Sequence, residues 1–337
     1  MIFVTGATGL VGTHLLIQLV RKNTPIRALY RSEKKKKQAK EVFTACCEPE
    51  DQDKFENIDW FQGDILDITS LEKAFHSVTH VYHCAGLISF NPSDYKKLRK
   101  VNIEGTANIV NQCIVNKIEK LCHVSSIAVF GSYHRNPVSE EAVWDPEQKH
   151  SVYAITKYGA EMEVWRGTQE GVDAVIVNPG VIIGRGFFES GSGYLFHLVD
   201  NGLSFYAPGS TGYVAVEDVV TSMQLLMDSN RKNDRYIVVA ENLSFKQVFT
   251  WISEALHRGK PKRKLSKTLL RIVYYVQWIG SLFGFKRSVF RSSIRSAFSH
   301  RIFDHQKVKK ELHISFNPVK EAIDTTALFF QRKNADR

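Results

Sequence analysis

Two patterns alternate along the first half of the chain: short apolar runs and longer stretches whose apolar residues recur at helical spacing. The apolar runs predict strands at residues 2–4, 26–30, 58–61, 78–83, 120–124 and 174–177. The longer stretches predict helices at 10–21, from about 70, at 101–116 and at 153–169, and a charged helical stretch follows the second strand. Strands separated by such helices form a parallel sheet with helices on both faces. We therefore expect an α/β fold built on a doubly wound parallel sheet.

The pattern changes at Asn178-Pro179-Gly180, after which a glycine-rich stretch, GRGFFESGSG, interrupts the regular elements. Residues 213–220 and 235–239 have the apolar character of core elements, so we expect them to return to the sheet domain. From residue 244 the chain is helical and increasingly basic. We expect a first domain over residues 1–178, with returning segments at about 211–240. Residues 179–210 and 241–337 would form a smaller, mainly helical substrate-binding part.

Composition limits the class of protein. Of the 337 residues, 43% are hydrophobic and 24% are charged, which is typical of a soluble globular chain. The first residues run into an apolar strand with no basic region or cleavage site, and the five cysteines form no C-x-x-C pair. We therefore expect a cytoplasmic protein with reduced thiols. No H-E-x-x-H spacing occurs, so we expect no metal site.

Positive charge is concentrated in one segment. The net charge is +10, and residues 258–310 contain 15 Lys and Arg but one acid, Asp304. Within this segment the run LLRIVYYVQWIGSLFGF, residues 269–285, is apolar on nearly every helical face. It is shorter than the about 20 residues that span a bilayer. The run therefore favours either a helix that closes the substrate pocket or a peripheral contact of residues 258–310 with an anionic membrane. Basic charge alone is no recognition motif, so we expect no nucleic-acid partner.

The turn after the first strand, TGATGLVG, carries three glycines at the start of a helix. Glycines there allow a tight turn, close approach of the backbone to a pyrophosphate and close packing of helix on sheet. The phosphates then lie at the positive end of the helix dipole. The sequence therefore predicts a dinucleotide site. The loop residues that we expect to contact the dinucleotide are Gly6, Thr8, Gly9, Leu10, Val11 and Gly12.

The end of the second strand indicates which dinucleotide binds. An NAD site places a carboxylate there for the ribose hydroxyls, whereas this chain has Tyr30 and Arg31. A guanidinium suits a ribose phosphate, so we favour NADP(H) and keep NAD(H) as the alternative. After the third strand, Asp64 can accept a hydrogen bond from the adenine amino group while Ile65 covers the ring. A simple turn aspartate is the competing interpretation.

Further motifs follow in a fixed order: HCAG after the fourth strand, VNIEGT on the next helix, VSSIAVFG after the fifth strand, and Tyr153-x-x-x-Lys157. Together with the glycine loop and the GDI that contains Asp64, they resemble the extended short-chain dehydrogenases/reductases, the NAD-dependent epimerase/dehydratase superfamily. The resemblance covers roughly residues 1–240. It implies a Rossmann-type fold and an oxidoreductase that acts on alcohol and carbonyl groups.

The resemblance also implies catalytic roles. Tyr153 would be the general acid in carbonyl reduction and the base in alcohol oxidation. A free phenol, with a pKa of about 10, is a poor base at neutral pH, so a nearby cation must favour the phenolate. Lys157 would be that cation and would also hold the nicotinamide ribose. Ser126 would hydrogen-bond the substrate oxygen, and Asn102 would support the lysine through water.

Other positions are assigned to the cofactor or to the substrate. The further cofactor contacts that we expect are Cys84, Ala85, Gly86, Ser125, Pro179, Gly180 and Val181. The substrate contacts that we expect are Ser89, Phe90, Phe130, Phe187 and Tyr194. Phe188, Phe196 and Tyr206 are further aromatic candidates for an apolar pocket, although some of these aromatic residues are expected in the core.

Three enzymatic functions and one non-catalytic function are candidates for a chain with these motifs. Dehydratases of this family carry acids directly after the catalytic hydroxyl, where this chain has Ile127 and Ala128, so dehydration is excluded. A nucleotide-sugar 4-epimerase with bound NAD remains an alternative. The aromatic variable region and the run IRALYRS favour a reductase of hydrophobic carbonyl compounds, similar to dihydroflavonol 4-reductases and hydroxysteroid dehydrogenases. A non-catalytic NADP-binding sensor or scaffold is the alternative of another class.

The resemblance also allows a homodimer, which would use the helices that carry Asn102 and Tyr153.

Overall fold

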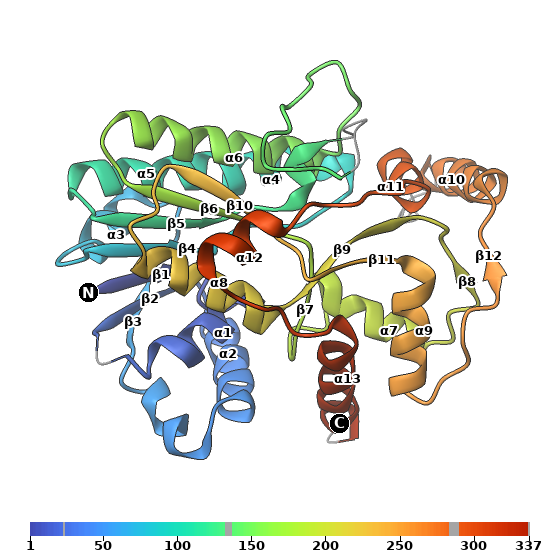
Figure 1. Cartoon of the computed structure of the whole chain (residues 1–337), viewed down its shortest axis with the longest axis horizontal. Helices are drawn as coiled ribbons and strands as arrows, with labels where there is room; N and C mark the ends of the chain where they lie inside the picture. The colour runs from blue at the N-terminus through green and yellow to red at the C-terminus, as the bar shows by residue number, and fades with distance from the viewer. Residues whose placement is uncertain (23, 132–136, 283–289, 336–337) are drawn as a thin grey trace.

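The computed structural model describes residues 1–22, 24–131, 137–282 and 290–335 (Figure 1). Its strands are β1 Ile2–Thr5, β2 Ile26–Tyr30, β3 Asp59–Gln62, β4 His80–His83, β5 Lys120–Val124, β6 Ala174–Pro179, β7 Val181–Ile183, β8 Phe205–Tyr206, β9 Ser210–Ala215, β10 Asp234–Val238, β11 Glu241–Ser244 and β12 Arg263–Lys264. Its α-helices are α1 Leu10–Leu19, α2 Glu33–Cys46, α3 Ile68–Ala74, α4 Tyr95–Leu98, α5 Gly105–Val115, α6 Val152–Gln169, α7 Tyr194–Asp200, α8 Val216–Asp228, α9 Phe245–Ala255, α10 Lys267–Leu282, α11 Arg291–Ala297, α12 Gln306–Leu312 and α13 Val319–Ala335.

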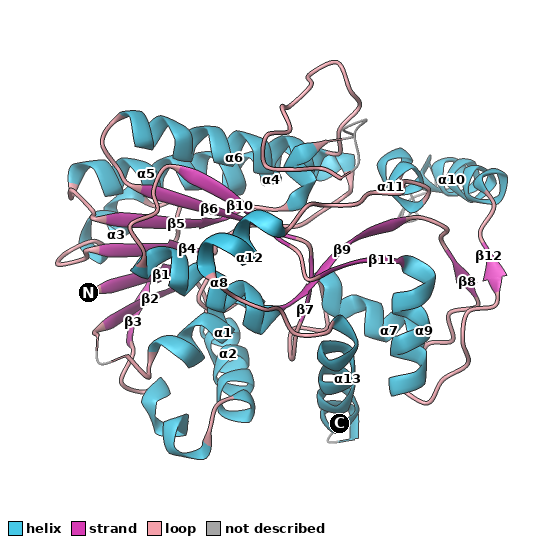
Figure 2. Ribbon diagram, in the orientation of Figure 1, coloured by secondary structure: helices cyan, strands magenta, loops and turns pink. Residues whose placement is uncertain are grey.

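Seven parallel strands form the main sheet in the order β10-β6-β5-β4-β1-β2-β3 (Figure 2). Successive side chains of a strand point to opposite faces. Val81 and Ile176 therefore pack in a cluster with α5, whereas their neighbours Tyr82 and Val175 pack in the cluster with α1 and α8. Burial on both faces explains why these strands are continuous apolar runs. The predicted Rossmann-type, doubly wound sheet is confirmed.

The segment predicted at residues 213–220 divides between two elements. β9 ends at Ala215 and pairs with β7 and β11 in a separate three-stranded sheet, and α8 begins at Val216. A short apolar run fits both a strand and a buried helix, so its pattern did not separate them. β10 returns to the main sheet beside β6, near the predicted residues 235–239.

The smaller part of the molecule surrounds the three-stranded sheet with α7, α9 and α13, and carries α10 and α11 at its far end (Figure 1). Phe188 lies in its core, with ring centroids 5.9 Å from Phe196 and 4.9 Å from Phe330. Phe188 and Phe196 are 5% and 1% exposed. These two aromatic residues therefore belong to the core and do not line a pocket. Their burial depends on packing against α13, which is remote in the sequence.

Candidate active site

The predicted site residues gather at one edge of the main sheet, where the parallel strands β1 to β6 end. Ligands of open α/β sheets bind in the crevice outside these carboxyl ends. Tyr153 and Lys157 come to this edge from α6, Asn102 comes from a π-helical segment, Arg99–Glu104, and Val181 begins β7. The remaining residues that follow the strand ends are Gly6, Thr8, Gly9, Leu10, Val11, Gly12, Arg31, Asp64, Ile65, Cys84, Ala85, Gly86, Ser125, Ser126, Pro179 and Gly180.

The three glycines of the first turn have different surroundings. Gly6 has a φ of +65°, and a Cβ there would come within 2.5 Å of the backbone of Cys84 and Ala85. A Cβ at Gly12 would overlap the Gly6 carbonyl oxygen, whereas one at Gly9 would meet the same oxygen at 3.4 Å. Gly6 and Gly12 thus allow the turn, β4 and α1 to pack closely. Gly9 directly precedes α1 with room above its backbone, which fits a phosphate at a helix N-terminus.

We expect Gly9→Ala and Gly12→Ala to separate binding from folding. The Gly12 variant forces a methyl group against backbone and should lose about 1–3 kcal/mol of folding free energy. The Gly9 variant should melt like the wild type without cofactor but bind NADPH at least about tenfold more weakly, because the methyl group holds the phosphate away from the amides. Melting temperatures with and without NADPH measure both effects. Equal losses in both variants would contradict these assignments.

Arg31 lies directly after β2 with its side chain 73% exposed, and its Nη1 is 3.5 Å from Oδ2 of Asp64. An ion pair this exposed contributes at most about 1 kcal/mol, so the guanidinium can turn toward a phosphate. The ammonium of Lys36 instead lies 5.0 Å from the ring centroid of Tyr30 and 5.5 Å from that of Trp60. Arg31 is therefore the better placed of these two cations for a ribose phosphate.

Asp64 and Ile65 have structural partners in the β3 turn. Oδ1 of Asp64 accepts a hydrogen bond from the backbone nitrogen of Leu66 at 3.0 Å. Ile65 is buried, and a Cβ at Gly105 would lie 2.5 Å from its Cδ1, so it fills the space against α5. The turn-aspartate interpretation accounts for this geometry. Contact of either residue with adenine stays a prediction.

The catalytic hydroxyl groups lie together. Ser126 caps the 3₁₀ turn Ile127–Phe130 and hydrogen-bonds Tyr153, which lies in the first turn of α6. Lys157, one helical turn further, is 5% exposed, and its Nζ donates to the carbonyl oxygen of Val124 at 2.7 Å. The ammonium is thus directed to the end of β5.

These surroundings decide the protonation states. Burial raises the pKa of Tyr153 to about 12, and the hydrogen bond with Ser126 opposes part of that rise. Burial lowers the pKa of Lys157 to about 8, while the carboxylate of Glu161 opposes the fall. The lysine was expected to lower the tyrosine pKa, whereas burial raises it in this structure. Tyr153 is a neutral phenol at neutral pH, which suits a proton donor.

Asn102 joins the loop after β4 to α6. Its Oδ1 accepts from the backbone nitrogen of Leu87 at 2.7 Å, and its Nδ2 donates to the Leu87 oxygen at 3.0 Å and to Oγ1 of Thr156 at 3.1 Å. Thr156 precedes Lys157, so Asn102 holds the lysine's helix against the loop that carries Gly86. This positioning role differs from the expected support through water, which stays a prediction.

His83, for which no role was predicted, connects the glycine turn to Asn102 through two threonine side chains. Burial lowers the pKa of His83 to about 3, so the ring is neutral. Thr106 Oγ1 donates to the Asn102 carbonyl oxygen at 2.6 Å and lies 2.9 Å from His83 Nε2, which must therefore carry the proton. Nδ1 then accepts from Thr5 Oγ1 at 2.6 Å. His83 is the first residue of the HCAG motif, in which only Cys84, Ala85 and Gly86 were assigned a contact.

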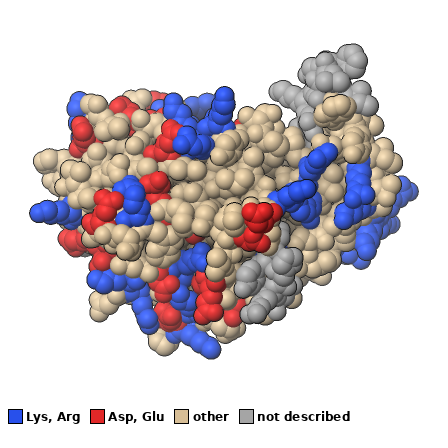
Figure 3. All heavy atoms as spheres, turned by 90° about the horizontal axis from the view of Figure 1, so that it is seen from above, with Lys and Arg blue, Asp and Glu red and all other residues tan. Residues whose placement is uncertain are grey.

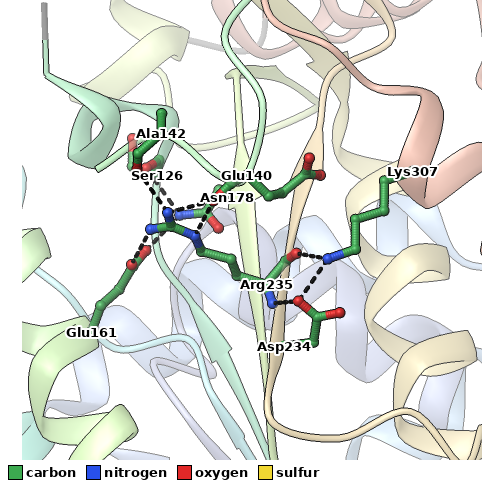
Figure 4. A network of polar contacts seen from close by, with 8 residues as sticks. All are labelled: Ser126, Glu140, Ala142, Glu161, Asn178, Asp234, Arg235 and Lys307. Carbon is green, nitrogen blue, oxygen red and sulfur yellow. Dashed lines mark hydrogen bonds and ion pairs between the residues drawn. The ribbon is translucent and has the colours of Figure 1, made fainter. Parts of the chain in front are cut away.

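Glu161 is a second functional residue that the sequence analysis missed. Its Oε1 accepts from Nδ2 of Asn178 at 2.5 Å, and its Oε2 lies 3.5 Å from Nη1 of Arg235 (Figure 4). Asn178 also donates to the Ser126 carbonyl oxygen at 3.3 Å. This network ties α6, β6, β10 and the Ser126 turn together. The signal was available, because Glu161 follows Lys157 at the spacing of one helical turn.

We expect kcat/KM for NADPH to be constant from about pH 6 to about pH 7 and to fall as the pH rises through about 8. This ratio reports groups of the cofactor-free enzyme, in which Lys157 loses its charge over that interval. A Lys157→Arg variant, whose guanidinium stays charged, should be slower but should lack the fall. A wild-type profile that rises through pH 8 would contradict the assignment.

The loop after β4 places apolar surface beside the catalytic tyrosine. Phe90 packs edge-on against Tyr153 with ring centroids 5.7 Å apart and is 49% exposed, and Ile88 is 55% exposed. Ser89 Oγ donates to Asp94 Oδ2 at 2.6 Å, which fixes the loop. Phe90 is therefore in position for the substrate contact expected of it.

The other expected pocket residues have different environments. Phe130 is 1% exposed and packs in the core beneath the guanidinium of Arg235, 4.8 Å from its ring centroid, so it has no surface to offer a substrate. Tyr194 is 49% exposed at the start of α7, and Phe187 is partly buried. A Cβ at Gly191 would lie 4.0 Å from Ile88, so the segment that carries Phe187 and Tyr194 approaches the loop of Phe90. Tyr206, in β8, lies under the ammonium of Lys246 at 5.2 Å.

Known proteins are similar to this chain in sequence and in fold. A putative dihydroflavonol 4-reductase of Synechocystis is 26% identical over 340 residues, 98% of this chain and 94% of the relative. Sterol demethylase protein B of Methylococcus capsulatus is 24% identical over 270 residues, 80% and 78% of the two chains. UDP-glucose 4-epimerase of Thermotoga maritima, solved with UDP-glucose, superposes with a TM-score of 0.77 at 17% identity over 99% of both chains, which shows the shared fold. The model of the NAD dependent epimerase/dehydratase family matches residues 2–240, and the chain belongs to this family of NAD(P)-dependent enzymes.

Proposed function

We propose that this protein is an NADP(H)-dependent oxidoreductase that interconverts a carbonyl group and a secondary alcohol on a hydrophobic small molecule. The observation that carries this proposal is the exposed ring of Phe90 against the ring of Tyr153, beside the exposed side chain of Ile88. A sugar would need polar partners at this position. An aromatic or alicyclic ketone would instead gain binding free energy by covering the apolar surface of these side chains. The similarity to a putative dihydroflavonol 4-reductase supports the same class of substrate.

The side chains of the site can carry out the proton transfer of a reduction. The hydroxyl groups of Ser126 and Tyr153 would meet the substrate oxygen, where they stabilise developing negative charge. Tyr153, a phenol at neutral pH, gives its proton to that oxygen, and Lys157 keeps positive charge close to the β5 end. When bound, the nicotinamide supplies the hydride for the carbonyl carbon.

The cofactor preference rests on Arg31. Its exposed guanidinium at the end of β2 can form charge-assisted hydrogen bonds with a ribose phosphate, for which it would leave only a weak pair with Asp64. The open backbone at Gly9 suits the pyrophosphate. These features support NADP(H) over NAD(H).

The test is to purify the protein, identify the nucleotide that it binds, and follow NADPH oxidation with aromatic and alicyclic ketones and with UDP-sugars. We expect exchangeable NADPH and turnover of apolar ketones. Tightly held NAD⁺ together with interconversion of UDP-sugars would replace this proposal with the epimerase. Binding of NADPH without turnover of any carbonyl compound would favour a sensor or scaffold.

A further inference from the structure

One face of α10 exposes large apolar side chains to solvent. Residues three and four apart lie on the same side of a helix, and these side chains follow that spacing. The exposed apolar residues of this face, with their exposed fractions, are Leu269 39%, Ile272 55%, Tyr275 55%, Val276 63% and Trp278 47%. We call these five residues the α10 face. Contiguous apolar patches on a soluble protein mark a contact with a partner or a membrane.

The opposite side of α10 faces the protein. Leu270, Val273, Tyr274 and Gln277 are partly buried, and the guanidinium of Arg291, from α11, lies 5.6 Å from the ring centroid of Tyr274. The helix therefore rests on α11 and still turns its other side outward. It lies at the end of the molecule farthest from the β3 edge of the main sheet (Figure 1). A helix that only closed a pocket would bury its apolar side chains.

The surroundings of the α10 face are strongly basic. Residues 255–303 contain 12 Lys and Arg and no Asp or Glu. In the view of Figure 3, the end formed by β12 and α10 shows Lys and Arg and no acidic side chain. Lys260 is held by Glu254 at 2.6 Å and Arg258 by Asp200 at 3.0 Å. The other exposed cations on α10 and on the segment before it are Lys262, Arg263, Lys264, Lys267 and Arg271.

We propose that the α10 face binds the surface of an anionic lipid bilayer. Apolar side chains on one face with cations around them are the features of a helix that lies in the membrane interface. The Tyr275 and Trp278 rings suit the headgroup level, where amphipathic aromatic rings collect. Among the described residues, no helix is long and apolar enough to cross a bilayer. The contact that we propose is a peripheral one, and it is independent of the proposed enzymatic activity.

A symmetric contact between two copies fits this surface less well. A twofold interface brings the same patch of both subunits together, so the cations around one α10 face would meet those around the other. Like charges in contact weaken association. Anionic lipid headgroups supply the opposite charge, and each Lys or Arg near such a surface strengthens binding about fivefold.

The test is flotation of the full chain with vesicles of phosphatidylcholine alone and of phosphatidylcholine with phosphatidylserine. We expect the protein to float with the anionic vesicles, to stay behind with the neutral ones, and to lose most of its binding at high salt. The fluorescence of Trp278 should shift to the blue on binding, and a Trp278→Phe variant should remove that component.

Two variants test the two halves of the surface. K262E/K264E reverses two exposed charges and should lower the partition coefficient at least about twentyfold. I272Q/V276Q removes apolar area from the outer face and should abolish flotation. All four side chains are exposed, so both variants should fold and keep the activity of the wild type. The matched controls, K73E/K117E and I68Q/L328Q, change exposed side chains outside this segment and should bind like the wild type.

Two outcomes would overturn the proposal. The first is that the wild-type chain does not bind anionic vesicles, or that the control variants lose as much vesicle binding as the test variants. The second is a dimer in sedimentation experiments that I272Q/V276Q converts to a monomer while vesicle binding is absent. That result would assign the α10 face to a second copy of the chain.

Discussion

We expect Tyr153→Phe to lower kcat for carbonyl reduction by about 10²–10⁴ while the variant binds NADPH as tightly as the wild type. The substitution removes the hydroxyl group that hydrogen-bonds Ser126 and keeps the ring that packs against Phe90. The fold and the apolar surface should therefore stay intact, so the loss reports proton donation. Single-turnover oxidation of bound NADPH measures the chemical step directly.

Tyr158→Phe is the control for this result. Tyr158 lies in the same helix, but its ring stacks on Trp144 with centroids 4.4 Å apart, away from Ser126. Its hydroxyl group should be dispensable, so activity should be close to that of the wild type. Full activity of the Tyr153 variant, or an equal loss in both variants, would refute Tyr153 as the proton donor.

The second large effect is expected at the cofactor. Arg31→Ser should raise KM for NADPH about 10- to 100-fold and leave KM for NADH nearly unchanged, because a hydrogen bond to a charged group contributes about 1.5–3 kcal/mol. The side chain is 73% exposed, so its removal should not disturb the fold. Steady-state kinetics with both nucleotides measure the two constants.

Two further variants make this result specific. Lys37→Ser removes an exposed cation in the first turns of α2 and should change KM for NADPH far less. Arg31→Asp should invert the preference, because a carboxylate repels the phosphate and can accept hydrogen bonds from ribose hydroxyls. Similar losses for NADPH and NADH in Arg31→Ser would show that the guanidinium does not recognise the phosphate.

The order of the sheet elements could be predicted because each strand of the main sheet is a short apolar run between breaks. The strands at 26–30 and 120–124 were predicted with the bounds that β2 and β5 have. The elements after residue 180 were predicted less well, because contacts between segments far apart in the sequence determine how they pack. The apolar run of α10 shows this, because its sequence is apolar on nearly every side and only packing on α11 determines which side is outward.

The candidate site was predictable where spacing along one element fixes geometry. Gly6 and Gly9 lie in one turn and Gly12 lies at the start of the helix that follows it, and Tyr153 and Lys157 share one helical face. The hydrogen-bond partners of buried side chains were harder to predict, because His83 and Arg235 contact residues that lie far from them in the sequence. Phe130 shows the same limit, since its place under Arg235 depends on β10, far along the chain.

The pairing of β7 with β9 has a consequence for how relatives can diverge. Ile183 pairs with Ala215 and Val181 with Tyr213, so the intervening chain leaves and rejoins the same small sheet. Residues 184–209, which include Phe187 and Tyr194, therefore form a segment whose two ends are held together by the pairing of β7 with β9. Doubling the length of such a loop costs only about 0.6 kcal/mol. We therefore expect relatives to differ in length and sequence at exposed positions of this segment, such as Tyr194, while Phe188 and Phe196 keep it packed on the core.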